Sequence, residues 1–226
     1  MLRPFTRPST VVAFGIAAIV VVVAFGFLIS KTEAMTNVDL RIDKALNHLH
    51  TGFLGALGSG VYWLFEPTHA VLITLVVALV IWARSKNLRL AVTFAFVVGF
   101  TWLASDVVKL LVHRDRPDPA ALLHPFSPEP VDPSFPSGHA VFVATMIVAL
   151  YLLARGTSFR TGIVLGGIAV AIVAAFALLS DGVHYPSDVL ASYAWSVGVA
   201  PLVLLGWNRF VLPRTYRAAR SADVIA

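Results

Sequence analysis

The sequence predicts an all-α polytopic membrane protein, a bundle of six transmembrane helices, on three observations. Of its 226 residues, 58% are hydrophobic and only 13% are charged, whereas a soluble globular domain carries roughly 25% charged residues. The apolar residues gather in six runs, most of them close to the roughly 20 residues that a helix needs to cross a bilayer. Basic residues gather in alternate links between these runs, as they do in the cytoplasmic loops of membrane proteins.

The six runs fill most of the chain, so we expect a single membrane-embedded domain over residues 1–226. The first run follows two arginines, as in a signal peptide, but it exceeds the 7–15 apolar residues of a signal peptide, which favours a retained helix. In chain order, the predicted spans are residues 10–29, 64–83, 90–112, 139–154, 161–179 and 187–212.

The link after the first span and the glycines of the fifth span predict two further structural features. In the polar link of residues 31–60, Val38, Ile42 and Leu46 alternate with charged residues, which fits a short amphipathic helix in the membrane interface. An ordinary solvated loop explains the same composition equally well. In the fifth span, the G-x-x-x-G of Gly162 and Gly166 predicts a face for close helix packing.

The distribution of charge predicts that both termini are cytoplasmic. Six spans place the two termini on one side, and that side receives 11 of the 17 basic residues: Arg3, Arg7, Arg84, Lys86, Arg89, Arg155, Arg160, Arg209, Arg214, Arg217 and Arg220. This sorting also accounts for the net charge of +5, so we expect contacts with the lipid bilayer and no nucleic-acid partner. The absence of cysteine excludes disulfides, thiolate metal sites and cysteine nucleophiles.

Three polar stretches stand at the outer ends of predicted helices. They are residues 109–117 after the third span, residues 136–139 at the start of the fourth, and residues 184–188 at the start of the sixth. Because alternate helix ends in a bundle share one face, we expect the three stretches to converge on the extracytoplasmic side.

The first two stretches offer ligands for a phosphate group. Lys109 needs an anion, because a cation costs roughly 2.5–3.5 kcal/mol at the centre of a span, and Arg114 and Arg116 are planar donors suited to phosphate oxygens. Ser137 and Gly138 open a helix, where free N–H groups and the helix dipole favour an anion. These residues describe a phosphate site that needs no metal and no other cofactor.

Some of these residues have a plainer alternative. Arg114 could equally anchor to lipid headgroups through its long side chain, and Lys109 could pair with Asp106, one helical turn earlier. Five of the seven histidines are expected to be structural: His48, His50, His69, His113 and His124.

The remaining two histidines have the spacing of an acid–base pair. His184 precedes Asp188 by four residues, and a carboxylate bonded to one imidazole nitrogen leaves the other free as a nucleophile. His139, at the start of the fourth span, is placed to protonate a leaving oxygen.

Together the three stretches resemble the motifs of the type 2 phosphatidic acid phosphatase superfamily of membrane lipid phosphatases. Lys109 to Pro117 matches K-x6-R-P, and Pro136 to His139 matches P-S-G-H. His184 and Asp188 match the H-x3-D half of the third motif, S-R-x5-H-x3-D. The resemblance implies hydrolysis of a lipid phosphate or polyprenyl diphosphate, of the undecaprenyl diphosphate or phosphatidic acid type, at the outer leaflet.

The resemblance also implies a role for each matching residue. His184 would attack phosphorus and form a phosphohistidine, Asp188 would orient it, and His139 would serve as general acid. The phosphoryl oxygens would be held by Lys109, Arg116, Ser137 and the Gly138 amide.

One departure from the family pattern bears on activity. The Ser-Arg pair of the third motif is replaced by Ala177 and Leu178, and loss of one preorganised donor typically costs about 10²–10³ in rate. Three alternatives follow: Arg114 substitutes for the missing arginine, the substrate differs from that of the family, or the chain is a catalytically impaired homologue that binds lipid phosphate without efficient turnover. A transporter is a weaker alternative, since the sequence has no internal repeat with paired broken spans.

Overall fold

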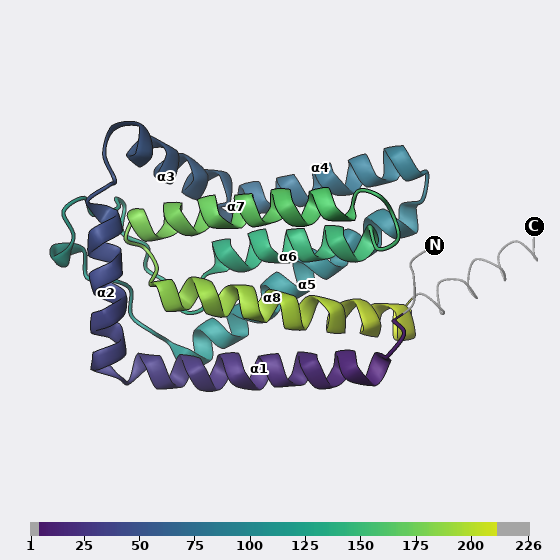
Figure 1. The fold of residues 1–226 in the computed structure, drawn as a ribbon, viewed down its shortest axis with the longest axis horizontal. Helices are drawn as coiled ribbons and strands as arrows, with labels where there is room; N and C mark the ends of the chain where they lie inside the picture. The colour runs from purple at the N-terminus through teal and green to yellow at the C-terminus, as the bar shows by residue number, and fades with distance from the viewer. Residues whose placement is uncertain (1–4, 212–226) are drawn as a thin grey trace, which may run out of the picture.

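The computed structural model describes residues 5–211, and within this range the chain is all-helical, which confirms the predicted fold class. Figure 1 shows a bundle of long helices with one helix lying across one end. The helices are α1 (Pro8–Ser30), α2 (Glu33–Asn47), α3 (Gly52–Leu64), α4 (Pro67–Ser85), α5 (Leu88–Val112), α6 (Gly138–Leu153), α7 (Arg160–Ser180) and α8 (Pro186–Gly206), with the short helices η1 (Pro119–Ala121) and η2 (Trp207–Val211).

The six predicted spans correspond to α1, α4, α5, α6, α7 and α8. Five of them are long and apolar enough to cross a membrane, while α6 has 16 residues and is shorter. The second span was predicted to begin at residue 64, but Leu64 ends α3 and Pro67 begins α4, because proline suits the first turn of a helix. Leu212 and the basic residues Arg3, Arg214, Arg217 and Arg220 lie outside the described residues.

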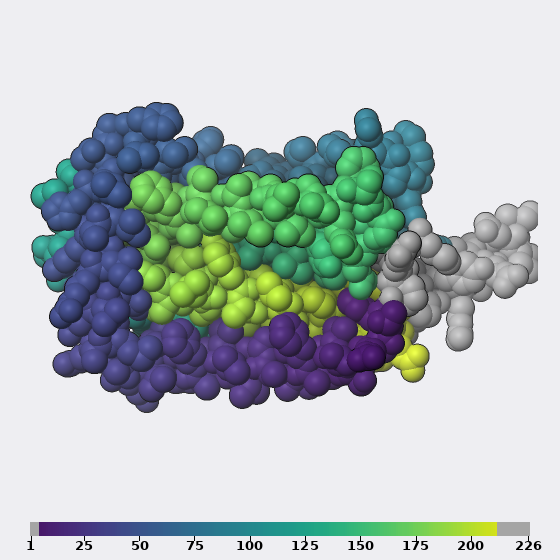
Figure 2. All heavy atoms as spheres, viewed as in Figure 1, coloured from purple at the N-terminus to yellow at the C-terminus, as the bar shows by residue number. Residues whose placement is uncertain are grey.

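Between α1 and α3 the chain forms a helix and not a loop, and that helix has its polar side turned inward. Asp39, Asp43 and Asn47 of α2, spaced four residues apart, are buried, whereas Val38 and Ile42 are exposed. In Figure 1 α2 crosses the end of the bundle, and in Figure 2 its atoms form the left edge of the visible face. The buried side of α2 therefore brings carboxylates to the ends of α7 and α8, on which it packs.

The helix α3 was not predicted, because its four glycines give the segment a low intrinsic helix propensity. The structure explains one of these glycines by close packing against the end of α7 and the turn that follows it. At Gly58, an added Cβ atom would lie 2.8 Å from Asp181 and 3.1 Å from Ser180. Tertiary contacts thus outweigh propensity in this segment.

The prediction of a packing face at Gly162 and Gly166 is wrong. An added Cβ atom at either glycine would meet no heavy atom within 4 Å. The adjacent Gly167 makes the close contact instead, with Ile147 of α6 only 2.5 Å from its added Cβ atom. Gly162 and Gly166 line an apolar groove of about 300 Å³, together with Phe65, which follows α3, and residues of α4 and α6.

The two helices that follow the second and third motifs are fixed to each other by buried polar contacts. The helix α8 packs on α1, α5 and α6. Thr145 of α6 donates to Ser196 of α8 (3.0 Å), and Trp195 of α8 donates to the carbonyl of Thr101 on α5 (3.0 Å). The N-terminal ends of α6 and α8 consequently meet at one end of the bundle, opposite the end where α1 begins and α8 stops (Figure 1).

Candidate active site

The three polar stretches converge at the end of the bundle crossed by α2. The rings of His139, at the start of α6, and His184, in the turn before α8, have centroids 6.5 Å apart and an interplanar angle of 63°. Arg116, which follows α5, brings a terminal nitrogen to 3.4 Å from Nε2 of His184. Two imidazoles and a guanidinium from three separate elements therefore face one another.

The position of His184 depends on a tight turn. Gly182 has a positive φ of 69°, and an added Cβ atom there would lie 2.2 Å from Leu122. The turn needs glycine both for its backbone conformation and for the close approach of the Pro-rich loop. Behind the turn, the carbonyl of Val183 accepts a hydrogen bond from Arg116 (2.5 Å).

His184 itself is buried, with 1% of its surface exposed. Burial, and then the nearby charges of Arg116 and Lys109, lower the pKa of His184 well below 6.5. The imidazole is therefore neutral at neutral pH, which is the state a nucleophile requires.

Asp188 lies in the first turn of α8, close to His184 but not hydrogen-bonded to it. One carboxylate oxygen is 3.7 Å from Nδ1 of His184, longer than a hydrogen bond. That oxygen accepts the backbone N–H of Tyr185 (2.9 Å), and the other accepts Arg114 (2.6 Å). Nδ1 of His184 has no hydrogen-bond partner among the described residues.

Arg114 lies in a buried charge cluster beneath the histidines, with 3% of its surface exposed. It donates to Asp188 and to Ser187 (2.7 Å) of α8, and to Asp39 of α2 (2.8 Å). Its guanidinium carbon also lies 4.1 Å from the ring centroid of Tyr185. The structure thus ties this predicted phosphate ligand to carboxylates of two helices; we refer to Arg114, Asp39, Asp188 and Ser187 as the charge lock.

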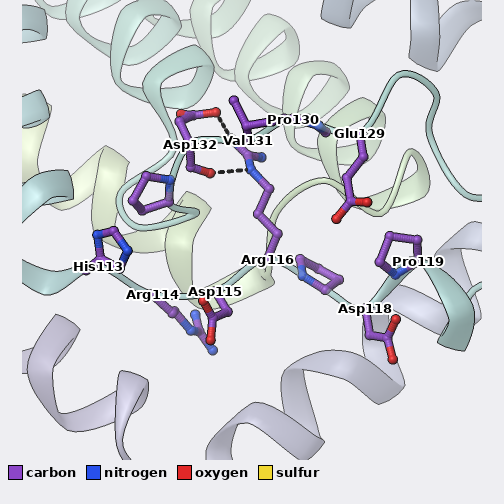
Figure 3. A pocket seen from close by; sticks show the side chains of 12 residues that line it. His113, Arg114, Asp115, Arg116, Asp118, Pro119, Glu129, Pro130, Val131 and Asp132 are labelled. Carbon is purple, nitrogen blue, oxygen red and sulfur yellow. Dashed lines mark hydrogen bonds and ion pairs between the residues drawn. The ribbon is translucent and has the colours of Figure 1, made fainter.

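Lys109 and Arg116 share a different carboxylate. Lys109 lies 2.5 Å from one oxygen of Asp132, and Arg116 lies 2.8 Å from the other. The predicted alternative partner of Lys109, Asp106, does not form this ion pair. Figure 3 shows Arg116 and Asp132 joined beside a pocket of about 580 Å³, which is lined by residues 113–119 and 129–133.

At the start of α6, the second motif is arranged as a helix N-terminus. Ser137 is the N-cap, and its buried hydroxyl accepts the backbone N–H of Ala140 (3.4 Å). An added Cβ atom at Gly138 would make only ordinary contact with Trp102 (3.6 Å), so the glycine is not required by the packing of the protein itself. Its small size leaves the backbone amide open to approach.

His139 packs against an aromatic ring that no sequence motif pointed to. The ring of Tyr62, from α3, has its centroid 4.3 Å from that of His139. Nε2 of His139 is buried and has no hydrogen-bond partner among the described residues. A buried, unpartnered imidazole nitrogen facing a second histidine is available for a ligand.

Asp132, Asp39 and Tyr62 are the site residues that the motifs did not reveal. Asp132 is one of several acidic residues in a Pro-rich loop, and Tyr62 lies in a Gly-rich link, so neither stands in a recognisable pattern. Asp39 did leave a signal, because it begins the run of polar residues at four-residue spacing on α2. In residues 5–211, no group of three or more histidine or acidic side chains is placed to hold a metal ion.

Comparison with known proteins finds one protein family and relatives that are named as phosphatases. The model of the PAP2 superfamily matches residues 88–211. The undecaprenyl-diphosphatase of Sulfolobus acidocaldarius is 33% identical over 150 residues, which cover 65% of this chain and 63% of the relative. The lipid A 1-phosphatase of Rhizobium johnstonii is 32% identical over 137 residues, covering 56% of this chain and 54% of the relative.

The chain spans less than two thirds of the length of these curated relatives. Among solved structures, the crystal structure of a transmembrane PAP2-type phosphatidylglycerolphosphate phosphatase from Bacillus subtilis matches 92% of this chain and 98% of its own, with a TM-score of 0.70 and 21% identity. That likeness supports the fold over nearly the whole length of both chains.

Proposed function

Because the chain belongs to the PAP2 superfamily, we propose that it is a membrane phosphatase that hydrolyses a lipid phosphate or polyprenyl diphosphate through a phosphohistidine. The observation that carries the proposal is the pairing of His139 and His184, 6.5 Å apart between ring centroids, with Arg116 beside His184. A phosphoryl group between the two rings would be in reach of a nucleophile on one side and an acid on the other.

The reaction would proceed in two displacements. Nε2 of His184 attacks phosphorus, the bond from phosphorus to the leaving oxygen breaks, and His139 gives its proton to that oxygen. Water then attacks the phosphohistidine, its proton passes to His139, and the bond from phosphorus to nitrogen breaks. Both histidines thereby return to their starting states, and inorganic phosphate leaves.

Four groups are proposed to hold the phosphoryl oxygens during these steps. They are the side chains of Lys109 and Arg116, the hydroxyl of Ser137 and the backbone amide of Gly138. Preorganised donors aimed at developing charge are usually the largest single contribution to catalysis of this kind. Lys109 and Arg116 already bind one anion jointly, the carboxylate of Asp132, which supports their joint role.

Asp188 and Arg114 are proposed to position His184 without contacting the phosphate themselves. A hydrogen bond from Nδ1 of His184 to Asp188 requires an approach of roughly 1 Å from the present 3.7 Å. Since the charge lock fixes the carboxylate, the imidazole ring is the part that would move. We therefore assign Arg114 the positioning of Asp188, and not the phosphate contact that the sequence suggested.

The groove beside α6 supports a lipid as the substrate. Tyr62 contacts His139, and one helical turn below, Phe65 contacts Phe142 with ring centroids 6.0 Å apart. From Phe142 the groove follows α6 to Leu150, which lies roughly 16 Å below His139 at 1.5 Å per residue. That is close to half the roughly 30 Å of a bilayer core, so a tail in one leaflet would fit.

The open glycines of the groove allow this to be tested without a steric clash. Gly166→Leu is expected to raise KM for long-chain phosphatidic acid by at least about tenfold, an effect of about 1.4 kcal/mol, and to leave KM for a short-chain analogue unchanged. Gly99→Leu is the control, because Gly99 also has no neighbour within 4 Å of an added Cβ atom but lies on α5 outside the groove. Equal KM values in both variants would exclude the groove as the tail site.

The proposed side of the membrane is the outer leaflet, with both termini cytoplasmic. The support is the segregation of the described chain: the motif stretches share one end of the bundle, while the basic links at residues 85–88 and 154–160 lie at the other (Figure 1). Labelling of single cysteines introduced at residues 86 and 131 in intact cells would test this, since the chain has no cysteine of its own.

The activity itself is tested by phosphate release in detergent from undecaprenyl diphosphate and phosphatidic acid, with and without a chelator. Release that is unaffected by the chelator and lost in His184→Ala is expected. Release that survives His184→Ala would exclude the phosphohistidine, and release that depends on a metal would exclude the metal-free mechanism.

Leu178 supports a second candidate, a homologue that binds lipid phosphate with little turnover. In place of the family's arginine it is 1% exposed and packs in an apolar cluster with Ala140, Val183 and Val189. Phosphate release by the native chain at a rate comparable with active family members would exclude this candidate. Release by Leu178→Arg alone would favour it.

A further inference from the structure

We infer that Asp132 is an internal anion that competes for Lys109 and Arg116, and that this competition selects doubly charged terminal phosphates over the singly charged phosphodiesters of the surrounding bilayer. The inference rests on the proposed function, because it takes these two cations as the phosphate ligands.

Asp132 binds the two cations as an inorganic oxyanion would. Its two carboxylate oxygens go to different partners, one to Lys109 (2.5 Å) and the other to Arg116 (2.8 Å). Arg116 in turn lies 3.4 Å from Nε2 of His184. The carboxylate therefore sits where an anion must lie if it is to bind both cations of the first motif next to the nucleophile.

The carboxylate comes from a segment that can release it. The side chain of Asp132 is 50% exposed, whereas those of Asp39 and Asp188 in the charge lock are 10% and 0% exposed. The loop is held at its base by Ser134, whose backbone N–H donates to the backbone carbonyl of Arg114 (2.8 Å) and whose hydroxyl donates to the backbone carbonyl of Asp115 (3.0 Å). A rotation of the Asp132 side chain would break both ion pairs and open the two cations to another anion, while these contacts and the hydrogen bond from Nε of Arg116 to the backbone carbonyl of Asp132 (2.8 Å) remain.

Protonation would not release the carboxylate under ordinary conditions. Burial acts to raise the pKa of Asp132, but the hydrogen bond and charge of Lys109, together with Arg116, outweigh it and hold that pKa well below its ordinary value. Asp132 is thus an anion at every pH at which the protein would work, and only another anion replaces it.

The charge of the incoming group decides the exchange. Asp132 carries one negative charge and is tethered to the site, which gives it an effective concentration on the order of millimolar. A terminal phosphate carries about −1.5 to −2 at pH 7, so it gains more from two cations than the carboxylate does. A phosphodiester headgroup carries one charge, has no such advantage, and is excluded although it is far more abundant in a membrane.

The experiment compares Asp132→Asn with Glu129→Gln in the full-length protein. Both variants remove one negative charge from the same loop, but Glu129 makes no ion pair with any described residue. The measurements are inorganic phosphate binding by calorimetry in detergent, and inhibition of phosphatidic acid hydrolysis by phosphatidylglycerol, a singly charged diester, in mixed micelles.

Asp132→Asn is expected to bind inorganic phosphate at least about tenfold more tightly than the native protein, and to become sensitive to phosphatidylglycerol. Glu129→Gln is expected to resemble the native protein in both measurements. The inference is overturned if the two variants behave alike, or if Asp132→Asn binds phosphate more weakly, which would make Asp132 a support of the site and not a competitor. Because phosphate binding is read without turnover, a chain that releases no phosphate would refute the proposed function and leave this test intact.

Discussion

Two arginines, separated by a single residue, have opposite surroundings in this protein. Arg114 is buried and pairs with Asp39 and Asp188, which stand on the helices α2 and α8. Arg116 pairs with Asp132, which stands on a loop and is half exposed. The difference between the two arginines lies in where their carboxylates come from.

A carboxylate on a packed helix is a permanent partner, whereas a carboxylate on a loop can be exchanged. The charge lock is therefore a device for holding α2, α8 and the end of α5 together. The cations of Lys109 and Arg116 are instead held ready for an anion. The same substitution made at Arg114 and at Arg116 should therefore have different effects, one on stability and the other on turnover.

The largest effect is expected from breaking the charge lock with Arg114→Met. Removing one partner of a buried ion pair leaves the other charged and unpaired, which costs about 3–5 kcal/mol, and here two carboxylates are left. We expect a much lower thermal unfolding temperature in detergent, with Arg116→Met as the matched control. Equal losses in the two variants would show that Arg114 is no more structural than Arg116.

Arg116→Ala is expected to act mainly on turnover. Loss of one preorganised donor reduces the rate by about 10²–10³, while half-exposed Asp132 is left in contact with Lys109 and water. The measurement is kcat/KM for phosphatidic acid, beside the unfolding temperature of the same sample. A protein that unfolds early and keeps its kcat/KM when folded would reverse the assignment of the two arginines.

A smaller effect is expected on the pH dependence of kcat/KM. Because burial, Arg116 and Lys109 lower the pKa of His184, the nucleophile stays neutral until the pH falls below 6.5, and the acid limb of the native protein should lie under that value. Arg116→Ala removes a positive charge and should move the limb to higher pH, whereas Asp132→Asn should move it to lower pH. Since ionisation of the substrate is the same in every sample, shifts in one direction for both variants would contradict this account.

A last effect, confined to the pH dependence of stability, is expected at Asp43, which faces the charge lock from α2. Both its carboxylate oxygens are buried without a hydrogen-bond partner in the described chain, and burial, with the charges of Asp188 and Asp39, raises the pKa of Asp43 to about 9. The folded protein keeps this proton while the unfolded chain loses it near pH 4, so stability should fall as the pH rises from about 4 to about 9.

Asn cannot ionise, so Asp43→Asn is expected to remove that loss. Its unfolding temperature should match that of the native protein near pH 4 and exceed it increasingly towards pH 8, by about 2–4 °C for each kcal/mol. An unfolding temperature that is lower than the native value at pH 8 would mean that Asp43 is ionised and useful in the folded state.

The sequence was most informative where one physical rule dominates. Hydropathy located the six helices α1, α4, α5, α6, α7 and α8, five of them long enough to cross a membrane, because the bilayer demands long apolar helices whatever their neighbours are. The fates of Arg114 and Arg116 could not be separated in this way, since both are basic residues after the same helix. Only the folded chain determines that Asp39 and Asp188 reach one of them and Asp132 the other.

In two segments of the first half of the chain, local sequence likewise could not predict the helix or its orientation. Glycines argued against a helix at residues 52–64, yet Gly58 is needed there for close packing on the end of α7. In α2 the helical spacing of Asp39, Asp43 and Asn47 was readable, but the usual orientation, with polar residues towards water, would have turned them outward. The polar residues of α2 face inward because their partners are buried, and those partners come together only when the bundle has folded.

The side chains that α2 and α3 supply to the site limit how far the chain can be truncated from its N-terminus. The family match begins at Leu88 and contains every motif residue, so a fragment that starts there would still carry all the residues of the three motifs. It would lack Asp39, which holds the second terminal nitrogen of Arg114, and Tyr62, the ring on which His139 rests. Deletion variants that aim for a minimal stable unit should therefore start before α2.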